Sequence, residues 1–234
     1  MDFGIYTYLI LNIGTLLGPL ALSFDKKVAF FRSWKSLFPA MFITGAVFLI
    51  WDVLFTEAGV WHFNPDYVVG VYFLGLPIEE WMFFFTVPYA SVFIYACVRA
   101  YFPKWELKKI SKPLAWSMIA FALLIGVLNL DKAYTSVTAF LLATWFSLVM
   151  LRGNTSYLGH FFQSWLIDLV PLFIVNGVLT ALPVVVYNNT ENLSIRLGTV
   201  PIEDLFYNML LLLMNVSLYE FFRQRGQYKP ALQS

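Results

Sequence analysis

The chain of 234 residues is 60% hydrophobic and 19% aromatic, and only 12% of its residues are charged. An ordinary soluble domain carries about 25% charged residues, so this composition indicates a membrane protein. The formal net charge of +1 provides no basic surface of the kind that binds nucleic acid, and the single cysteine, Cys97, excludes an internal disulfide.

Long uncharged stretches predict seven membrane-spanning helices. Backbone groups inside lipid find no water to bond, so a span needs about 20 mostly apolar residues in a helix. The chain begins Met1-Asp2, without the basic segment that opens a signal peptide, so we expect the first span to be retained. In chain order, the predicted spans cover residues 3–22, 37–55, 77–98, 114–130, 133–151, 164–187 and 201–222.

The positive charges between the spans fall almost entirely on one side. If all seven spans alternate in direction, thirteen of the 15 Lys and Arg residues, Lys229 among them, reach one face. Only Lys132 and Arg196 reach the other face. Because Lys and Arg stay on the cytoplasmic side of a membrane, the N-terminus is predicted to lie outside and the C-terminus inside.

The sequence contains an internal repeat. A shift of 124 residues places the PIEE motif at Pro77 on the PIED motif at Pro201, and it places Asp52 on Asn176. The shift superimposes the first three spans on the last three and leaves the fourth as a connector. The predicted fold class is therefore all-α membrane, a 3+1+3 parallel repeat whose halves relate by an axis along the membrane normal. One integrated membrane domain is expected, with a first three-helix repeat (1–102), a connector helix (103–131) and a second three-helix repeat (132–234).

Both Pro-Ile-Glu motifs open a predicted span on the same, non-cytoplasmic face. Proline at the first helical position followed by a carboxylate is also ordinary helix N-terminal chemistry, so either motif alone is more simply a cap. Two copies at equivalent places, each with a second acid beside the glutamate, favour a catalytic role. The candidate catalytic acids are Glu79, Glu80, Glu203 and Asp204.

Further polar residues lie inside the predicted spans, at intervals of about four along one helical stripe. Ionisable groups in lipid usually face the interior of a bundle, so the stripes predict a polar cavity between the two halves. The same residues could instead be hydrogen-bonding contacts between helices. The supporting polar candidates are Asp52, Asp168, Asn176 and Asn208.

Aromatic residues lie close to the acids in the sequence. They are typical of packing and of lipid anchoring, and they could also line a substrate or stabilise a cation. The candidates for that second role are Trp51, Trp81, Phe83 and Tyr207.

No sequence pattern indicates a metal or a cofactor. His62 and His160 stand in predicted loops on opposite faces, so they cannot share a metal ion and are expected to be solvated. Neither the G-x-G-x-x-G nor the GxxxxGK[ST] phosphate-binding loop is present. We therefore expect no metal site and no cofactor.

These motifs resemble the lycopene cyclase domain family. The resemblance rests on the doubled PIEE and PIED motifs, the WDVLFT stretch that begins at Trp51, the Gly-Val-Trp that ends at Trp61 and the 3+1+3 plan. The family includes two-subunit bacterial lycopene β-cyclases and the cyclase part of the fungal bifunctional phytoene synthase/lycopene cyclase. This chain looks like both subunits fused in one, although the second half has Val175-Asn176 in place of a Trp-Asp pair. The resemblance implies that the four acids of the paired motifs are essential to ring closure.

The candidate acids suit ring closure without a cofactor. Closing the end of a linear carotene into a β-ionone ring requires protonation of a terminal double bond, attack of a second double bond on the carbocation, and loss of a proton. A carboxyl kept neutral by an apolar pocket and a neighbouring carboxyl can donate that proton. We expect Glu79 and Glu203 to face each other, with Glu80 and Asp204 tuning them or accepting the proton.

The predicted function is that of an integral-membrane lycopene β-cyclase, an isomerase of the intramolecular lyase class, in the cell membrane. Its expected partners are lycopene or a similar linear carotene, membrane lipid and other carotenoid enzymes, with no nucleic acid. Because both acid pairs open on one face, we expect a single shared site that processes one end of the carotene at a time. The alternatives are a 3+1+3 proton-coupled small-solute transporter and a cyclase that acts on another linear carotene.

Overall fold

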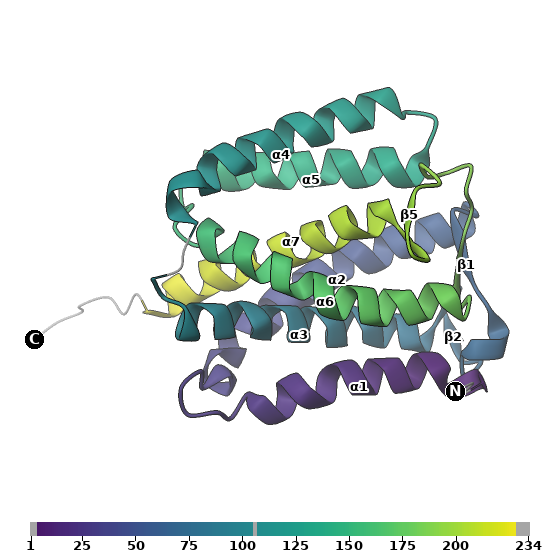
Figure 1. The fold of residues 1–234 in the computed structure, drawn as a ribbon. Helices are drawn as coiled ribbons and strands as arrows, with labels where there is room; N and C mark the ends of the chain where they lie inside the picture. The colour runs from purple at the N-terminus through teal and green to yellow at the C-terminus, as the bar shows by residue number, and fades with distance from the viewer. Residues whose placement is uncertain (1–3, 105–106, 228–234) are drawn as a thin grey trace, which may run out of the picture.

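The computed structural model describes residues 4–104 and 107–227. Three features of the sequence analysis lie outside this part of the chain: Met1-Asp2, the start of the first predicted span at residue 3, and Lys229. Seven α-helices form one bundle in the described residues, with α1 at one edge and α4 at the opposite edge (Figure 1). They are α1 (Thr7–Leu22), α2 (Trp34–Glu57), α3 (Ile78–Tyr101), α4 (Lys108–Leu128), α5 (Ala133–Leu151), α6 (Leu158–Ala181) and α7 (Ile202–Gln227).

The prediction of seven spans is confirmed, because seven helices are long and apolar enough to cross a membrane. The predicted limits of the sixth span were wrong at both ends, since α6 begins at Leu158 and ends at Ala181. Pro183 follows two residues after this end. The residue before a proline avoids the helical conformation and proline itself lacks an N–H, so the chain leaves the helix there.

Short strands at one end of the bundle depart from the purely α-helical expectation. They form three two-stranded antiparallel sheets. We call this the strand end of the bundle (Figure 1). The pairs are β1 (Trp61–Phe63) with β4 (Val185–Tyr187), β2 (Tyr72–Phe73) with β3 (Leu76–Pro77), and β5 (Arg196–Leu197) with β6 (Val200–Pro201).

Two of the sheets are tight hairpins that lead directly into α3 and α7. In the β2–β3 hairpin, Leu74 and Gly75 have φ values of 50° and 79°. Positive φ at both central residues matches the twist of a two-residue hairpin, and glycine adopts it without strain. The hairpins therefore deliver each Pro-Ile-Glu motif at the first turn of its helix.

The third sheet joins segments far apart in the sequence. β1 follows α2 and β4 follows α6, and their register pairs Trp61 with Tyr187, His62 with Val186 and Phe63 with Val185. Backbone hydrogen bonds therefore connect the two predicted halves across the strand end.

The helices of the two predicted halves interlock. α2 packs on α7, and α3 packs on α6, so the second helix of each half contacts the third helix of the other. α1 covers α3, α5 covers α7, and α4 lies against α5 and α6. The apolar core lies where α2, α3 and α7 meet, with Phe48, Phe84 and Tyr207 in ring contact. The inward-facing side chains of α2, α3, α6 and α7 consequently share a common interior.

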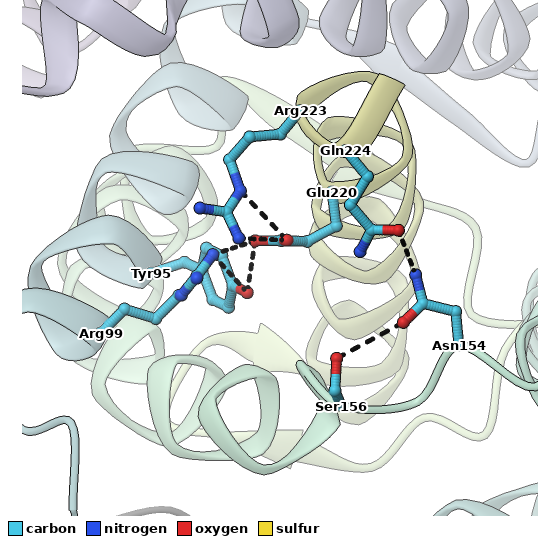
Figure 2. Close-up of polar contacts among 7 residues, drawn as sticks. All are labelled: Tyr95, Arg99, Asn154, Ser156, Glu220, Arg223 and Gln224. Atoms are coloured by element: carbon cyan, nitrogen blue, oxygen red, sulfur yellow. Dashed lines mark hydrogen bonds and ion pairs between the residues drawn. The ribbon is translucent and has the colours of Figure 1, made fainter. Parts of the chain in front are cut away.

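The end of the bundle opposite the strands contains a buried ionic cluster around Glu220 of α7 (Figure 2). Arg99 of α3 and Arg223 of α7 both form ion pairs with its carboxylate, and Tyr95 donates a hydrogen bond to it at 2.8 Å. A buried charge is unfavourable unless it is paired and hydrogen-bonded. The cluster therefore holds α3 and α7 together at this end.

Candidate functional site

A cavity of about 80 Å³ lies between the two predicted halves and reaches the strand end. One water needs roughly 10–15 Å³ by the same kind of measure, so the cavity can admit a small organic group. Six helices and the strands β1 and β4 contribute to its wall. The acidic, amide and phenolic side chains in the wall are Tyr8, Asp52, Glu80, Tyr134, Asp168, Asn176, Tyr187, Asp204, Tyr207 and Asn208.

The cavity brings together most of the residues that the sequence singles out. Eight of the twelve candidates line it: Asp52, Glu80, Phe83, Asp168, Asn176, Asp204, Tyr207 and Asn208. The other four are Trp51, Glu79, Trp81 and Glu203, which lie outside its lining. No Lys, Arg or His is among the described residues that line it, so no basic side chain of the wall neutralises the acids.

Glu79 and Glu203 are buried, but each is directed at its own loop. Glu79 Oε1 accepts a hydrogen bond from the Val69 N–H at 2.7 Å, and Glu203 Oε1 accepts one from the Leu193 N–H at 2.7 Å. Glu203 Oε1 also accepts a hydrogen bond from the Thr135 hydroxyl at 2.7 Å. The structure therefore differs from the expected arrangement in which the two glutamates face each other. Each one fastens the loop at the strand end to the start of its helix, where the helix dipole favours a carboxylate.

The second acid of the first motif stands beside another carboxyl group. Glu80 Oε2 accepts a hydrogen bond from the Tyr8 hydroxyl at 2.5 Å, and Asp52 Oδ1 accepts one from Trp61 Nε1 at 2.6 Å. The Glu80 and Asp52 carboxyls are within side-chain hydrogen-bonding reach of each other. Asp52 Oδ2 is buried and forms no hydrogen bond within the described residues, although the Thr56 hydroxyl lies near this carboxyl. Ionised carboxylates only accept hydrogen bonds. The two acids can therefore form a hydrogen bond with each other only if one of them carries a proton.

The second acid of the second motif stands among donors. Asp204 Oδ1 accepts a hydrogen bond from the Tyr134 hydroxyl at 2.7 Å. Its Oδ2 accepts two more, from Asn176 Nδ2 at 3.0 Å and from the Tyr187 hydroxyl at 3.1 Å. Burial raises the pKa of the Tyr187 phenol well above its usual value, and the nearby Asp204 carboxylate raises it further. Tyr187 therefore remains a donor to Asp204 throughout the physiological pH range.

The sequence reasoning missed the tyrosines that bind the two acids. Tyr8 on α1 serves Glu80, and Tyr134 on α5 serves Asp204. These tyrosines are 126 residues apart, whereas the acids that they bind are 124 apart. A shift of 124 without a gap therefore does not align the two tyrosines. An alignment that allowed two extra residues between the first and second spans of the first half would have matched Tyr8 with Tyr134.

A further carboxyl lies deeper in the bundle. Asp168 Oδ2 accepts hydrogen bonds from Ser91 Oγ and Asn208 Nδ2, both at 3.0 Å. Asp168 precedes Asn176 by two turns of α6, or about 12 Å along the helix axis. Acidic side chains therefore occur at two depths in a largely apolar wall, and the acids of the two motifs are concentrated near the strand end.

The four aromatic candidates divide into two groups. Phe83 and Tyr207 line the cavity, and Trp51 packs behind Tyr207 with ring centroids 4.9 Å apart. Trp81 lies instead in an apolar groove on the outside of α2 and α3, where its Nε1 donates to the Phe73 carbonyl at 3.2 Å. The structure therefore gives no support to the expected contact of Trp81 with a cation in the cavity.

The two histidines also differ from expectation in part. His62 is exposed in β1, but His160 is buried inside α6 instead of standing in a loop. Within residues 4–104 and 107–227, no group of three His, Cys, Asp or Glu side chains is arranged to hold a metal ion.

The membrane-length helices fit a membrane protein, and the cavity between them is lined with acids that no basic side chain of the described lining neutralises. The family model described as lycopene cyclase matches residues 5–98 and 131–222, which contain α1, α2 and most of α3, and then α5, α6 and most of α7. This chain belongs to the lycopene cyclase family, and the resemblance noted in its motifs is confirmed. No curated protein and no solved structure matches it. At the level of the family, the chain is a carotenoid cyclase with a linear carotene as its substrate.

Proposed function

We propose that this chain is a lycopene β-cyclase of the cell membrane, an isomerase that closes the ψ-ends of lycopene to β-ionone rings, giving γ-carotene and then β-carotene. The observation that carries the proposal is the single cavity into which Glu80 and Asp52 project from the first half and Asp204 from the second. An alkene is a weak base, so its protonation needs a neutral carboxylic acid in an apolar, water-poor site.

The reaction follows from these groups without a change of oxidation state. A carboxyl adds a proton to the terminal double bond, a second double bond attacks the resulting cation, and a carboxylate removes a proton from the new ring. One proton enters and one leaves, so the product is an isomer of the substrate. The faces of Phe83 and Tyr207 border the cavity and can stabilise the cation through their ring quadrupoles.

The proposal includes the 3+1+3 repeat. α2 and α6 begin 124 residues apart and end 124 residues apart, and the same interval separates β1 from β4, β2 from β5 and β3 from β6. In the β1–β4 sheet, His62 pairs with Val186, which is the residue 124 positions later. An antiparallel pair centred on equivalent residues has local two-fold symmetry, which supports an axis along the membrane normal between the halves.

The proposed orientation places the strand end outside the cell and the Glu220 cluster on the cytoplasmic side. Lys132 and Arg196 are at the strand end, whereas Arg99, Arg152 and Arg223 are at the opposite end. This distribution follows the excess of positive charge that cytoplasmic segments carry. Both second acids then lie near the outer face, so one shared site processes one end of the carotene at a time.

The test is production of the full chain in a bacterium that accumulates lycopene, with the extracted pigments separated by chromatography. We expect γ-carotene and β-carotene from the wild-type chain and a strong loss of both from Glu80→Gln. Asp66→Asn is the matched control, because Asp66 is an exposed acid in the strand-end loops. The membrane fraction is assayed for equal amounts of each variant. Unchanged lycopene with well-produced wild-type protein would overturn the proposal and direct the test to other linear carotenes.

A further inference from the structure

We propose that the two halves have opposite roles in the reaction: the Asp52–Glu80 pair is the proton donor, and Asp204 is the ionised carboxylate that takes up the departing proton. This inference rests on the proposed cyclase function and assigns the acid and the base within it. It is carried by the hydrogen-bond donors that surround each acid.

The first half has more acceptors than donors. The carboxyls of Asp52 and Glu80 have four oxygen atoms. The Trp61 indole and the Tyr8 hydroxyl donate hydrogen bonds to them, and the Thr56 hydroxyl lies near Asp52 as a third donor. Two ionised carboxyls in contact, with no basic group in the cavity wall, would repel each other strongly in a medium of low dielectric. A proton held between them removes this repulsion and gives the buried, unpartnered Asp52 Oδ2 a partner. The pair therefore stores one proton beside the cavity.

The second half has more donors than acceptors. Three groups donate to the two oxygens of Asp204, namely Tyr134, Asn176 and Tyr187. An ionised carboxylate only accepts hydrogen bonds, and donors directed at it stabilise the charged form. Asp204 is therefore the negative group of the cavity, suited to attract a carbocation and then to accept a proton from it.

One position accounts for most of the difference between the halves. Asp52 and Asn176 are 124 residues apart, each beside the second acid of its own motif. In the first half that neighbour is a carboxyl, which must share a proton with Glu80. In the second half it is an amide, whose N–H₂ donates to Asp204. The absence of the Trp-Asp pair from the second half thus gives Asp204 a hydrogen-bond donor where Glu80 has a second acid.

The β1–β4 sheet supplies one of these donors to each half from a single pair of opposed residues. Trp61 and Tyr187 lie opposite each other in the register, and they donate to Asp52 and Asp204 respectively. The pair related to it by the repeat is Phe63 with Val185, which has no polar side chain. One pair of opposed residues in the sheet therefore contacts both acid groups of the cavity.

The proton balance closes within the cavity. The pair gives its proton to C2 of the terminal C1=C2 double bond, which leaves a cation at C1. The C5=C6 double bond attacks C1, forming the C1–C6 bond and moving the cation to C5. Asp204 removes the proton from C6, and the C–H electron pair forms the C5=C6 double bond of the β-ring. Transfer of this proton from Asp204 to the pair across the shared cavity restores the starting state.

The first test measures the stored proton without requiring activity. Infrared spectra of the purified full chain in lipid nanodiscs, recorded in H₂O and in D₂O, detect the carbonyl stretch of a protonated carboxyl. We expect such a band in the wild type, its loss in Asp52→Asn and in Glu80→Gln, and its retention in Asp204→Asn. A band that is unchanged in Asp52→Asn, or lost in Asp204→Asn, would overturn the assignment.

The second test uses the products formed in lycopene-accumulating cells. Without the donor no cation forms, so Asp52→Asn should lower the rate of lycopene conversion by about 100-fold or more, with no new pigment. Without the base a cation still forms but loses its proton elsewhere or captures water, so Asp204→Asn should give ε- or γ-type rings or hydrated carotenes. New pigments from Asp52→Asn, or none from Asp204→Asn, would reverse or overturn the roles.

The two tests separate this inference from the function on which it rests. If the wild-type chain forms no ring from lycopene, the proposed function fails, while the infrared spectra still determine which acids hold the proton. If the wild type is active and the variants respond in another pattern, only the assignment fails. Asp66→Asn serves both tests as the matched substitution of an exposed acid.

Discussion

The two ends of the bundle use buried carboxyls in different ways. At the strand end, Glu80 and Asp204 face a cavity whose described lining has no basic side chain. At the opposite end, Glu220 is enclosed by Arg99 and Arg223 (Figure 2). A carboxylate paired with two guanidinium groups cannot give or take a proton readily, whereas one surrounded by hydroxyls, an amide and another acid can. The two arginines therefore mark Glu220 as a structural acid, whereas Glu80 and Asp204 have no such partner.

The largest expected effect is on activity at the strand end. Glu80→Gln removes half of the proposed proton-sharing pair but keeps the size of the side chain. The rate of cyclisation should fall by about 100- to 10,000-fold, the usual contribution of a general acid. The melting temperature in detergent should stay within a few degrees of the wild-type value. A comparable fall in the melting temperature would show that Glu80 is mainly structural.

A reciprocal effect is expected at the other end. Glu220→Gln leaves Arg99 and Arg223 facing each other without a counter-charge. The free energy of unfolding should decrease by about 3 kcal/mol, at the low end for a broken buried ion pair, because both arginine side chains are 30% exposed. Denaturant unfolding measures this change. Cyclisation per folded molecule should be preserved, and its loss in a fully stable variant would remove the contrast between the two ends.

Exchanging the neighbours of Glu80 and Asp204 sharpens the comparison between the two acid groups at the strand end. In the double variant Asp52→Asn with Asn176→Asp, the acid pair moves to Asp204 and the amide moves to Glu80. Part of the activity lost in Asp52→Asn should return, about tenfold, which corresponds to 1.4 kcal/mol of barrier. Pigment formation rates for both single variants and the double variant measure this coupling. Strictly additive losses would mean that the neighbouring residue does not determine the role of each acid.

The smallest effect is expected from Tyr187→Phe. This change removes one of the three donors to Asp204 and leaves phenylalanine, as in Phe63 of the first half. Asp204 retains two donors, so cyclisation should slow by only about tenfold, the low end of the effect of one hydrogen bond to a charged group. Chromatography of the products should also show a higher share of ring isomers. An effect as large as that of Glu80→Gln would indicate that Tyr187 itself transfers the proton.

Much of the fold could be predicted from hydrophobic length and charge. The fifth span was predicted with the same limits as α5, because Lys132 and Arg152 bound one apolar run. The strand end was not predicted, because segments of two or three residues contain too little alternation to indicate strands. Their pairing also depends on contacts over long sequence distances, such as that of Trp61 with Tyr187.

Most residues around the cavity could be singled out from the sequence, but the direction in which each side chain points could not. Adjacent helical residues point about 100° apart, so the motif alone cannot show whether Glu79 or Glu80 faces the cavity. The structure places Glu80 in the lining and binds Glu79 to the Val69 N–H. Trp81, one residue further along α3, consequently faces the outer groove. Only the packing of neighbouring helices fixes this rotation, and no local sequence pattern encodes it.

The β1–β4 sheet has a consequence for how the two halves could diverge. Its register is maintained by main-chain groups, which every non-proline residue provides. Substitutions at Trp61 or Tyr187 can therefore change the chemistry of one half while the joint between the halves persists. If the halves are copies, as proposed, a chain that is joined in this way can specialise them one side chain at a time, because the connection between them does not depend on the residues that are being changed.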